Sequence, residues 1–493
     1  MRGMTRGFTR RLGPEGIAAL AMLGGGFALR IWLGQGLPLW LDESWTGMIA
    51  TQPNWASFWR EAWLDCNPPL YYAFMALWTG LFGASDIALR APSLIFALLA
   101  ALVPLIAPAP YLRRQTRWAL ALLIALWLPG FEISLDARGY ALLLLLSVVQ
   151  LFAFIRLMAS PTRRSALIWA SFASLAALTH YHALLVSGVQ GLSLLYVHRA
   201  RALALWPAAL AFVPAFGWLA VHAPRLADYA RPDVAWYEPM TAKLAMQFAT
   251  YPLGMANSLI LAVIAVILLI SLTSKQAPVT AQPAAPQMAR ALFWAVLASV
   301  VALAIALILG TLRPMLTARY LVPIVPGILF GLVLVGARGR WPGPGLAALV
   351  LCFALAVNPL ALRAQLVDKT RYGFAPASAF VAASSARHLV FTWDHPAARI
   401  LDAQSLAKLG GFFLQREGYR LPVTAVRLPP GRDGNALLQR LTPRDAGVIW
   451  VYNRARASAA RHRPPVPLLW HGRNCRLTHG AWIGTLACGP QQD

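Results

Sequence analysis

Two adjacent carboxylates, Asp42 and Glu43, directly follow the first long apolar run of the chain. A carboxylate at a boundary between water and an apolar medium can have its pKa raised toward working pH, which suits a general base. Such a base would take a proton from an acceptor hydroxyl, or it would bind an acceptor nitrogen or a metal ion. The alternative is structural, since acids also favour the first turn of a helix.

Further polar side chains stand in short segments between later apolar runs. The candidates for substrate binding are Asp65, Arg90, Asp136, Arg138, His180, His182, Arg319 and Tyr320. One arginine guanidinium can donate two parallel hydrogen bonds to phosphate oxygens, so the three arginines suit an anionic substrate. Charges at or inside a membrane are costly and are candidates for function, and Arg30 in the first run is another such charge.

Each of these residues also has a plainer interpretation. Arg90 could extend to lipid headgroups, and Asp136 and Arg138 could pair with each other. His180 and His182 are two residues apart, so on a helix they would point to different sides and make a weak metal pair. The sequence therefore predicts no certain cofactor and leaves a divalent metal open.

The composition explains what positions these residues. Of the 493 residues, 58% are hydrophobic and only 12% are charged, whereas a soluble domain carries about 25% charged residues. The formal net charge is +25, but the basic residues form short clusters between apolar runs, which is typical of cytoplasmic loops. We therefore predict an all-α polytopic membrane protein and no nucleic-acid partner.

Eleven apolar runs are long enough to cross a bilayer, which takes about 17–25 residues. They lie near 16–34, 91–110, 117–134, 139–157, 165–180, 183–198, 203–222, 255–273, 291–310, 320–337 and 344–361. The run 67–84 opens with two prolines, and counting it as a span would move the later basic clusters outside. We therefore expect interfacial helix there, within one long outer loop, and a cytoplasmic N-terminus. All the candidate residues, and the aromatic segment 222–254, then lie on the outer side.

The composition changes again near residue 364. Residues 364–493 mix charges, turns and short apolar runs at 388–393 and 446–452, which predicts a small α/β domain. With eleven spans in residues 1–363, this domain would lie in the periplasm. Cys475 and Cys488 could form a disulfide in such an oxidising compartment, and the sequence leaves this pairing open.

The chain lacks the motifs of soluble nucleotide donors. No phosphate-binding GxxxxGK[ST] loop and no GxGxxG after a strand occurs. Arginines and a carboxylate at one membrane face suit transfer from a lipid phosphate that is delivered within the membrane.

An ordered set of motifs resembles a known family. The acidic pair, NPPLYY, LFGASDIALRAPS, LDARGYALLLL, THYHALL and ARYLVPIVP, between about residues 16 and 340, resemble the GT-C glycosyltransferases of the family 39 type. These include protein O-mannosyltransferases and lipid A aminoarabinose transferases. The resemblance implies a polyprenyl-phosphate-linked sugar donor that is used at the periplasmic face of the inner membrane.

The resemblance also implies roles for single residues. Asp42 matches the acid that acts as base or binds the acceptor, and Glu43 matches the second acid. Arg90 matches a first-loop arginine of the mannosyltransferases, Asp136 a second-loop acid, and Arg319-Tyr320 a late-span motif. The sequence departs from the aminoarabinose transferases at Asn67, where these tend to have lysine before two prolines.

Taken together, the sequence predicts a hexosyl- or pentosyltransferase that acts on a lipid, glycan or protein acceptor. One alternative is a transporter or flippase of lipid-linked glycans, which would place polar residues and broken helices near the bilayer midplane. Another alternative is a glycan polymerase or ligase. The sugar and the acceptor stay open.

Overall fold

The computed structural model describes most of the first 370 residues and separate stretches beyond them. The described residues are 2–232, 234, 237–254, 258–273, 286–338, 342–370, 389–393, 400–416, 418, 422–427, 448–452, 469–470, 473–479 and 483–488. The chain divides into two compact units. The helical unit comprises Met1–Gln35, Arg90–Ala220 and Tyr237–Leu362, and the mixed unit comprises Gly36–Leu89, Val221–Trp236 and Arg363–Asp493. The predicted domain boundary at residue 363 stays a prediction.

The first 370 residues are almost entirely helical. Apart from α2 to α4, the helices are α1 (Arg2–Gly34), α5 (Asp86–Ile106), α6 (Arg114–Leu126), α7 (Leu128–Ser134), α8 (Tyr140–Ala159), α9 (Arg163–Thr179), α10 (Ala183–His198), α11 (Ala200–Leu203), η1 (Trp206–Phe212), α12 (Val213–Tyr229), α13 (Ala242–Thr250), η2 (Tyr251–Leu253), α14 (Ser258–Thr273), α15 (Pro286–Leu312), η3 (Ala318–Ile324), α16 (Val325–Gly336), α17 (Pro342–Ala356) and α18 (Pro359–Thr370).

The described helices confirm a multi-pass membrane protein. Six are long and apolar enough to cross a bilayer, or up to eight if two bent pairs each count as one span, judged by length and composition. These eight coincide with predicted spans. The other three predicted spans coincide with α9, α10 and α14, which have 17, 16 and 16 residues. At about 1.5 Å per residue they are shorter than a hydrocarbon core of about 30 Å, so a count of eleven spans stays a prediction.

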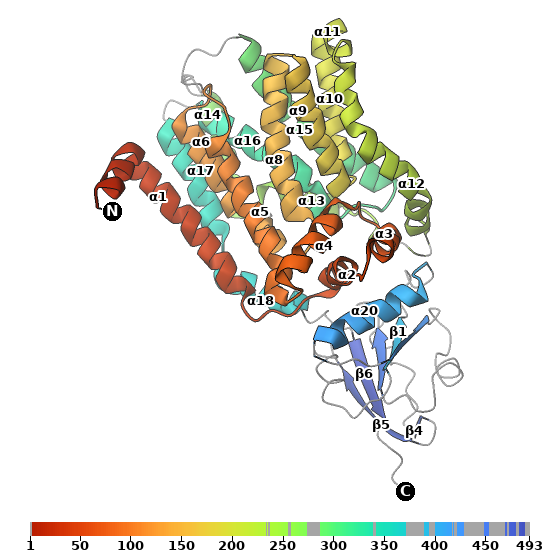
Figure 1. The fold of residues 1–493 in the computed structure, drawn as a ribbon. Coiled ribbons are helices and arrows are strands. Elements are labelled where there is room, and N and C mark those ends of the chain that lie inside the picture. Colours follow the sequence, from red (N-terminus) through yellow and green to blue (C-terminus); the bar gives the residue numbers. More distant parts are fainter. Residues whose placement is uncertain are drawn as a thin grey trace. The chain divides into compact units, whose positions relative to one another are not determined.

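Helices α8, α9, α10 and α15 pack side by side in the bundle (Figure 1). The short turn between α8 and α9 makes them antiparallel, and Thr162 caps α9 by accepting from Ser165 N. Inside the bundle, Gln150 Nε2 donates to Gln190 Oε1 at 2.8 Å, and Trp169 Nε1 donates to the same oxygen at 2.7 Å. This connectivity brings the start of α8, the end of α9 and the start of α10 to one end of the bundle.

A break between α6 and α7 shapes this same end. The two helices are bent by 62°. Pro129 has no N–H, so the carbonyl of Ala125, four residues earlier, loses its helical donor. Arg30 supplies the missing donor, with Nη2 2.7 Å from Ala125 O, while its Nε donates to Ser134 Oγ at 3.0 Å. The guanidinium also lies 3.9 Å from the ring centre of Phe131. Arg30 is buried and thus links the last turn of α6 to the last residue of α7.

The mixed unit combines short helices with a sheet. Its helices are α2 (Leu41–Ala50), α3 (Trp55–Leu64), α4 (Leu70–Phe82) and α20 (Ala403–Arg416), and its strands are β1 (Leu389–Trp393), β2 (Val423–Arg427), β3 (Val448–Tyr452), β4 (Leu469–Trp470), β5 (Arg473–His479) and β6 (Ile483–Cys488). At 13 residues, α4 is too short to span a bilayer, in agreement with the interfacial helix predicted within 67–84.

The sheet has the strand order β2-β1-β3-β6-β5-β4, and α20 packs against β1 and β2 (Figure 1). β1 pairs in parallel with β2 and β3, and the remaining pairs are antiparallel. Both strands predicted from apolar runs, 388–393 and 446–452, are present, so the predicted α/β character is confirmed. The register of β5 and β6 places Cys475 opposite Cys488, and their disulfide stays a prediction.

We expect Arg30→Met to lower stability. The Ala125 carbonyl and the Ser134 hydroxyl each lose a donor, which costs about 1–3 kcal/mol per buried group, and removal of a buried charge offsets part of that cost. The net loss should be about 2 kcal/mol, measured as a lower thermal midpoint in detergent. Arg164→Met, at an exposed arginine of α9, is the matched control. An unchanged or raised midpoint for Arg30→Met would show that burying the charge costs more than its bonds contribute.

Candidate active site

Four aromatic rings meet at the end of the bundle where α8 begins and α9 ends. The ring of Tyr320, in η3, lies 4.6 Å from His180 and 4.7 Å from His182 between ring centres. His180 lies 5.2 Å from His182 and 5.7 Å from Tyr140. The loop His180–His182 and the turn of η3 thus form one aromatic wall.

Two further tyrosines extend this wall. The Tyr237 hydroxyl lies 3.1 Å from the Tyr320 hydroxyl, so one donates to the other. Tyr251, in η2, lies on the other side of the break, where its carbonyl accepts from Trp127 Nε1 at 3.1 Å. Burial is the main cause that raises the pKa of Tyr251 well above its usual value, and the charge of Glu132 adds to this effect. The Tyr251 hydroxyl therefore stays protonated and able to donate near pH 7.

Arginines stand around the same wall. The guanidinium carbon of Arg319 lies 5.5 Å from the ring centre of Tyr140. The charges of Arg138 and Arg319 both reach His180, where they disfavour a further positive charge. Two arginines thus share one small region with the aromatic rings, which suits an anion with an attached ring. We call Arg138, Tyr140, His180, His182, Tyr237, Arg319 and Tyr320 the arginine–tyrosine cluster.

A buried turn holds Asp136 and Arg138 beside α5. Ser93 Oγ donates to the carbonyl of Asp136 at 2.6 Å, and the N–H of Arg138 donates to the same carbonyl at 2.7 Å. Arg90 precedes Ser93 by three residues on α5, so both point to the same side of the helix. All four side chains are buried. Arg90, Asp136 and Arg138 are thus buried side chains at or beside this turn, and their predicted part in substrate binding stays a prediction.

The two histidines of the cluster are neutral at physiological pH. Burial lowers the pKa of His182 to about 4. Burial also lowers the pKa of His180 well below its usual value, with further contributions from His182, Arg138 and Arg319. A neutral imidazole has one N–H donor and one acceptor. The positive charge of the cluster is thus carried by its arginines.

The acidic pair lies in the mixed unit, at the start of α2. Glu43 is fully buried, and its Oε2 accepts from the N–H of Trp40 at 3.0 Å, which is the second half of a capping box. Asp42, in contrast, is partly exposed. The ring of Trp40 also lies 4.1 Å from Lys369 Nζ. The helix-start interpretation therefore applies to Glu43, and Asp42 remains the better candidate for a base.

Asp65 holds a turn in the mixed unit. Its Oδ1 accepts from Asn67 N, Asn67 Nδ2 and the Tyr72 hydroxyl, each at 2.9 Å. These three bonds fix the chain before Pro68 and Pro69. They give Asp65 a structural function, and its predicted part in substrate binding stays a prediction.

A metal site is not evident among the described residues. No group of three or more His, Cys, Asp and Glu side chains with suitable spacing occurs there. Of the predicted site residues, Arg90, Asp136, Arg138, His180, His182, Arg319 and Tyr320 belong to the helical unit, whereas Asp42, Glu43 and Asp65 belong to the mixed unit.

Three residues near the cluster were not among the predicted site residues. Glu132 and Tyr251 interact across the α6–α7 break, and Tyr237 bonds to Tyr320. The only sequence signal for Tyr237 and Tyr251 was the aromatic character of the outer segment 222–254. No spacing pattern connects them to Tyr320, which is 83 residues after Tyr237.

The depressed pKa values make stability sensitive to acid. An unfolded histidine has a pKa of about 6.5, so between there and about 4 the unfolded chain binds a proton at His182 that the folded chain does not. Stability therefore falls as the pH falls through this window. We expect His182→Gln to reduce the loss between pH 7.5 and 5.5 by on the order of 1 kcal/mol, read from thermal midpoints. An equal loss in wild type and His182→Gln would contradict a neutral His182.

Comparisons with known proteins identify the fold. No family model matches this sequence, and no curated protein matches it. Crystal structures of ArnT from Cupriavidus metallidurans, in the apo state and bound to undecaprenyl phosphate, superpose with TM-scores of 0.62 and 0.63 at 12% identity, over 97% of this chain and 100% of theirs. The arabinofuranosyltransferase AftD from Mycobacteria gives 0.50 at 14% identity, over 96% of this chain and 40% of that longer one. The chain is thus a multi-pass membrane protein with the GT-C fold that its motifs predicted.

Proposed function

We propose that this protein is a membrane glycosyltransferase that moves a sugar from a polyprenyl-phosphate-linked donor to a lipid, glycan or protein acceptor. The reaction would take place at the periplasmic face of the inner membrane. The observation that carries the proposal is the arginine–tyrosine cluster, where Arg138 and Arg319 share one buried region with neutral aromatic side chains. The ArnT structure bound to undecaprenyl phosphate, which has the same fold, supports a polyprenyl phosphate as the anion.

The donor would be held through its phosphate and its sugar. Arg90, Arg138 and Arg319 supply charged donors for phosphate oxygens. Tyr320 and His182 supply ring faces and neutral donors for the sugar. Thr317 Oγ1, just before Arg319, is buried and has no hydrogen-bond partner within the described residues, so it is a further group for a polar ligand.

Asp42 would act as the general base. It accepts a proton from the acceptor hydroxyl as the acceptor oxygen attacks the anomeric carbon. The bond between the anomeric carbon and the phosphate oxygen breaks, and polyprenyl phosphate leaves with the electron pair. Arginines stabilise the charge that develops on the leaving group. One-step attack inverts the configuration at the anomeric carbon, whether the sugar is a hexose or a pentose.

The two alternatives make different demands on the chain. A flippase needs polar residues and broken helices along its path near the midplane, whereas the cluster gathers where α8 begins and α9 ends. A polymerase or ligase would take a diphosphate-linked glycan. Glycan profiles of membranes with and without the protein separate these functions, because only the proposed transferase adds single sugars and consumes a monophosphate donor.

Asp42→Asn tests the base. General base catalysis contributes about 10²–10⁴-fold, so we expect sugar transfer by Asp42→Asn to fall by at least about 10²-fold, at wild-type abundance. The assay follows sugar transfer in membranes supplied with polyprenyl-phosphate donors. Glu43→Gln is the matched control, since Glu43 caps α2, and it should reduce stability more than turnover. Full transfer by Asp42→Asn would show that the base is another group.

Arg319→Met tests the donor site. Loss of one charged hydrogen bond costs about 1.5–3 kcal/mol, so the affinity for undecaprenyl phosphate should fall by roughly tenfold to a hundredfold. Binding can be measured with purified protein in nanodiscs that contain increasing amounts of the lipid. Arg313→Met, at an exposed arginine in the same segment, should bind as the wild type does. Equal affinities of Arg319→Met and Arg313→Met would place the phosphate elsewhere.

A further inference from the structure

Helix α20 of the C-terminal segment packs directly on the acidic helix α2 within the mixed unit. Their contact needs glycine at position 47, since a Cβ there would overlap the ring of Phe412. Phe412 is itself buried. The helix that carries Asp42 and Glu43 therefore has a neighbour that is more than 350 residues later in the sequence.

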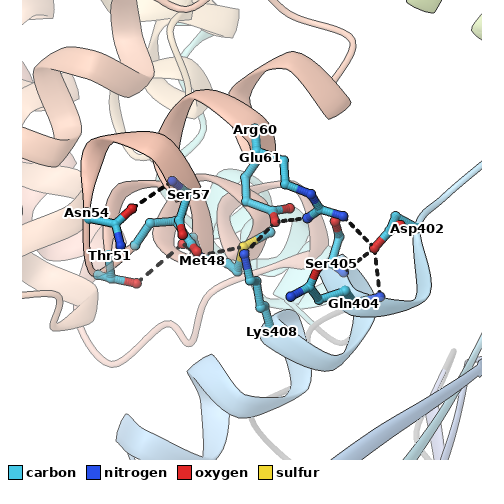
Figure 2. A network of polar contacts seen from close by, with 11 residues as sticks. Met48, Thr51, Asn54, Ser57, Arg60, Glu61, Asp402, Gln404, Ser405 and Lys408 are labelled. Carbon is cyan, nitrogen blue, oxygen red and sulfur yellow. Dashed lines mark hydrogen bonds and ion pairs between the residues drawn. The ribbon is translucent and has the colours of Figure 1, made fainter.

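A network of charges fastens α20 to α3 beside this contact (Figure 2). Lys408 Nζ lies 2.7 Å from Glu61 Oε1, and Arg60 Nη1 lies 2.5 Å from the same oxygen. Arg60 also reaches Asp402 Oδ1 at 2.9 Å through its Nη2. Asp402 in turn accepts from the backbone of Gln404 at 2.8 Å and so caps α20. The α3 charges and the first turn of α20 thus form one continuous unit.

Burial makes this network strong and sensitive to change. The Glu61 side chain is only 1% exposed, so its charge depends on Lys408 and Arg60 rather than on water. Three buried oxygens of the mixed unit have no hydrogen-bond partner within the described residues. They are Gln52 Oε1, Glu61 Oε2 and Ser405 Oγ. Buried polar atoms without hydrogen bonds already reduce the stability of this contact. The loss of one cation should therefore weaken the contact between α20 and α3.

Helix α2 contacts α20 beside this charge network. It also contacts α3 and α4, and its last turn is tied to the next residues by Thr51 Oγ1, which donates to Gly47 O at 2.8 Å, and by Gln52 Nε2, which donates to Met48 O at 2.8 Å. A movement of α20 would therefore act on α2 both through Phe412 and through α3.

We propose that α20 is a positioning element of the enzyme, and that the Lys408–Glu61 ion pair holds α2 where Asp42 can activate the acceptor. The C-terminal segment then contributes to turnover without touching the substrate. This inference rests on the proposed function, in which Asp42 is the base. The structural part of the inference is that α20 holds α2 in place. This part can be tested without an activity assay.

The first test is hydrogen exchange of the full-length protein in nanodiscs. In Lys408→Met, amides of residues 41–50 should exchange faster, on the order of tenfold. Lys408→Arg keeps the charge and should restore the slow exchange, and Lys243→Met, at an exposed lysine of α13, should not change it. Unchanged exchange of residues 41–50 in Lys408→Met would overturn the proposal.

The second test compares turnover with donor binding. A small displacement of a reacting group can cost on the order of 10²-fold in rate, so Lys408→Met should lower kcat for sugar transfer while its affinity for undecaprenyl phosphate stays at the wild-type value. Faster exchange with unchanged kcat would also overturn the positioning role. The proposed function fails separately, by full transfer in Asp42→Asn.

Gly47→Ala provides an independent variant if Lys408→Met folds poorly. It leaves every charge in place and displaces the Phe412 ring, so it should reproduce the faster exchange and the lower kcat. The double variant Glu61→Gln with Lys408→Met removes both charges of the pair, including the buried one of Glu61, and should exchange more slowly than Lys408→Met alone. Wild-type exchange and kcat in Gly47→Ala would show that packing of α20 does not position α2.

Discussion

The carbonyl of Ala125, which Pro129 leaves without its helical donor, is the constraint on which the cluster end of the bundle depends. Inside a membrane such a group must find a partner within the protein. Arg30 is that partner, at 2.7 Å, and because its Nε donates to Ser134 it links the last turn of α6 to the end of α7. Trp127 closes the break from the opposite side through the carbonyl of Tyr251. Gly254, with φ of +86°, then lets the chain pass close to the start of α7.

The position of the buried turn follows from that break. α7 ends two residues before Asp136, and Ser93 then holds the turn against α5. The direction of the chain after α7 thus decides where Arg138 and Tyr140 lie. The hydrogen bonds of Arg30 within the described part of the chain go to Gly26, Ala125 and Ser134 rather than to cluster residues, so Arg30 acts on the cluster through the path of the chain. A buried charge that binds backbone rather than substrate explains why an intramembrane arginine need not belong to the site.

The electrostatics of the cluster favour one kind of ligand. Burial lowers the pKa of both histidines, and the charges of Arg138 and Arg319 add to this effect at His180, so protonation of His180 would add to an existing excess of positive charge. An anionic ligand would relieve that excess, and it would gain more in a buried region than in water. The neutral rings beside the arginines then offer apolar faces without further charge. A phosphate that carries a sugar satisfies both parts of this environment.

The sequence was informative where chemistry and periodicity are local. Apolar runs indicated where the long helices lie, and the short apolar runs 388–393 and 446–452 indicated two strands. The motifs also supplied Asp136 and Arg138, which share one buried turn, and Arg90 on the helix beside it. No local pattern indicated which distant residue each polar group contacts in the fold. Nothing near Arg30 indicates a carbonyl 95 residues later, and nothing near Tyr237 indicates Tyr320.

The sequence also could not distinguish the roles of the two residues of the acidic pair. From the sequence, Asp42 and Glu43 were equal candidates for a helix cap and for a base. The capping bond of Glu43 to Trp40 N uses the carboxylate that is fully buried, and this bond is the half of a capping box that an acid supplies. Glu43 thus has a structural function at the start of α2. Asp42 is the more exposed of the two acids, which is why it is the proposed base. The packing of α20 against the same helix is the contact through which the proposed positioning of Asp42 would act.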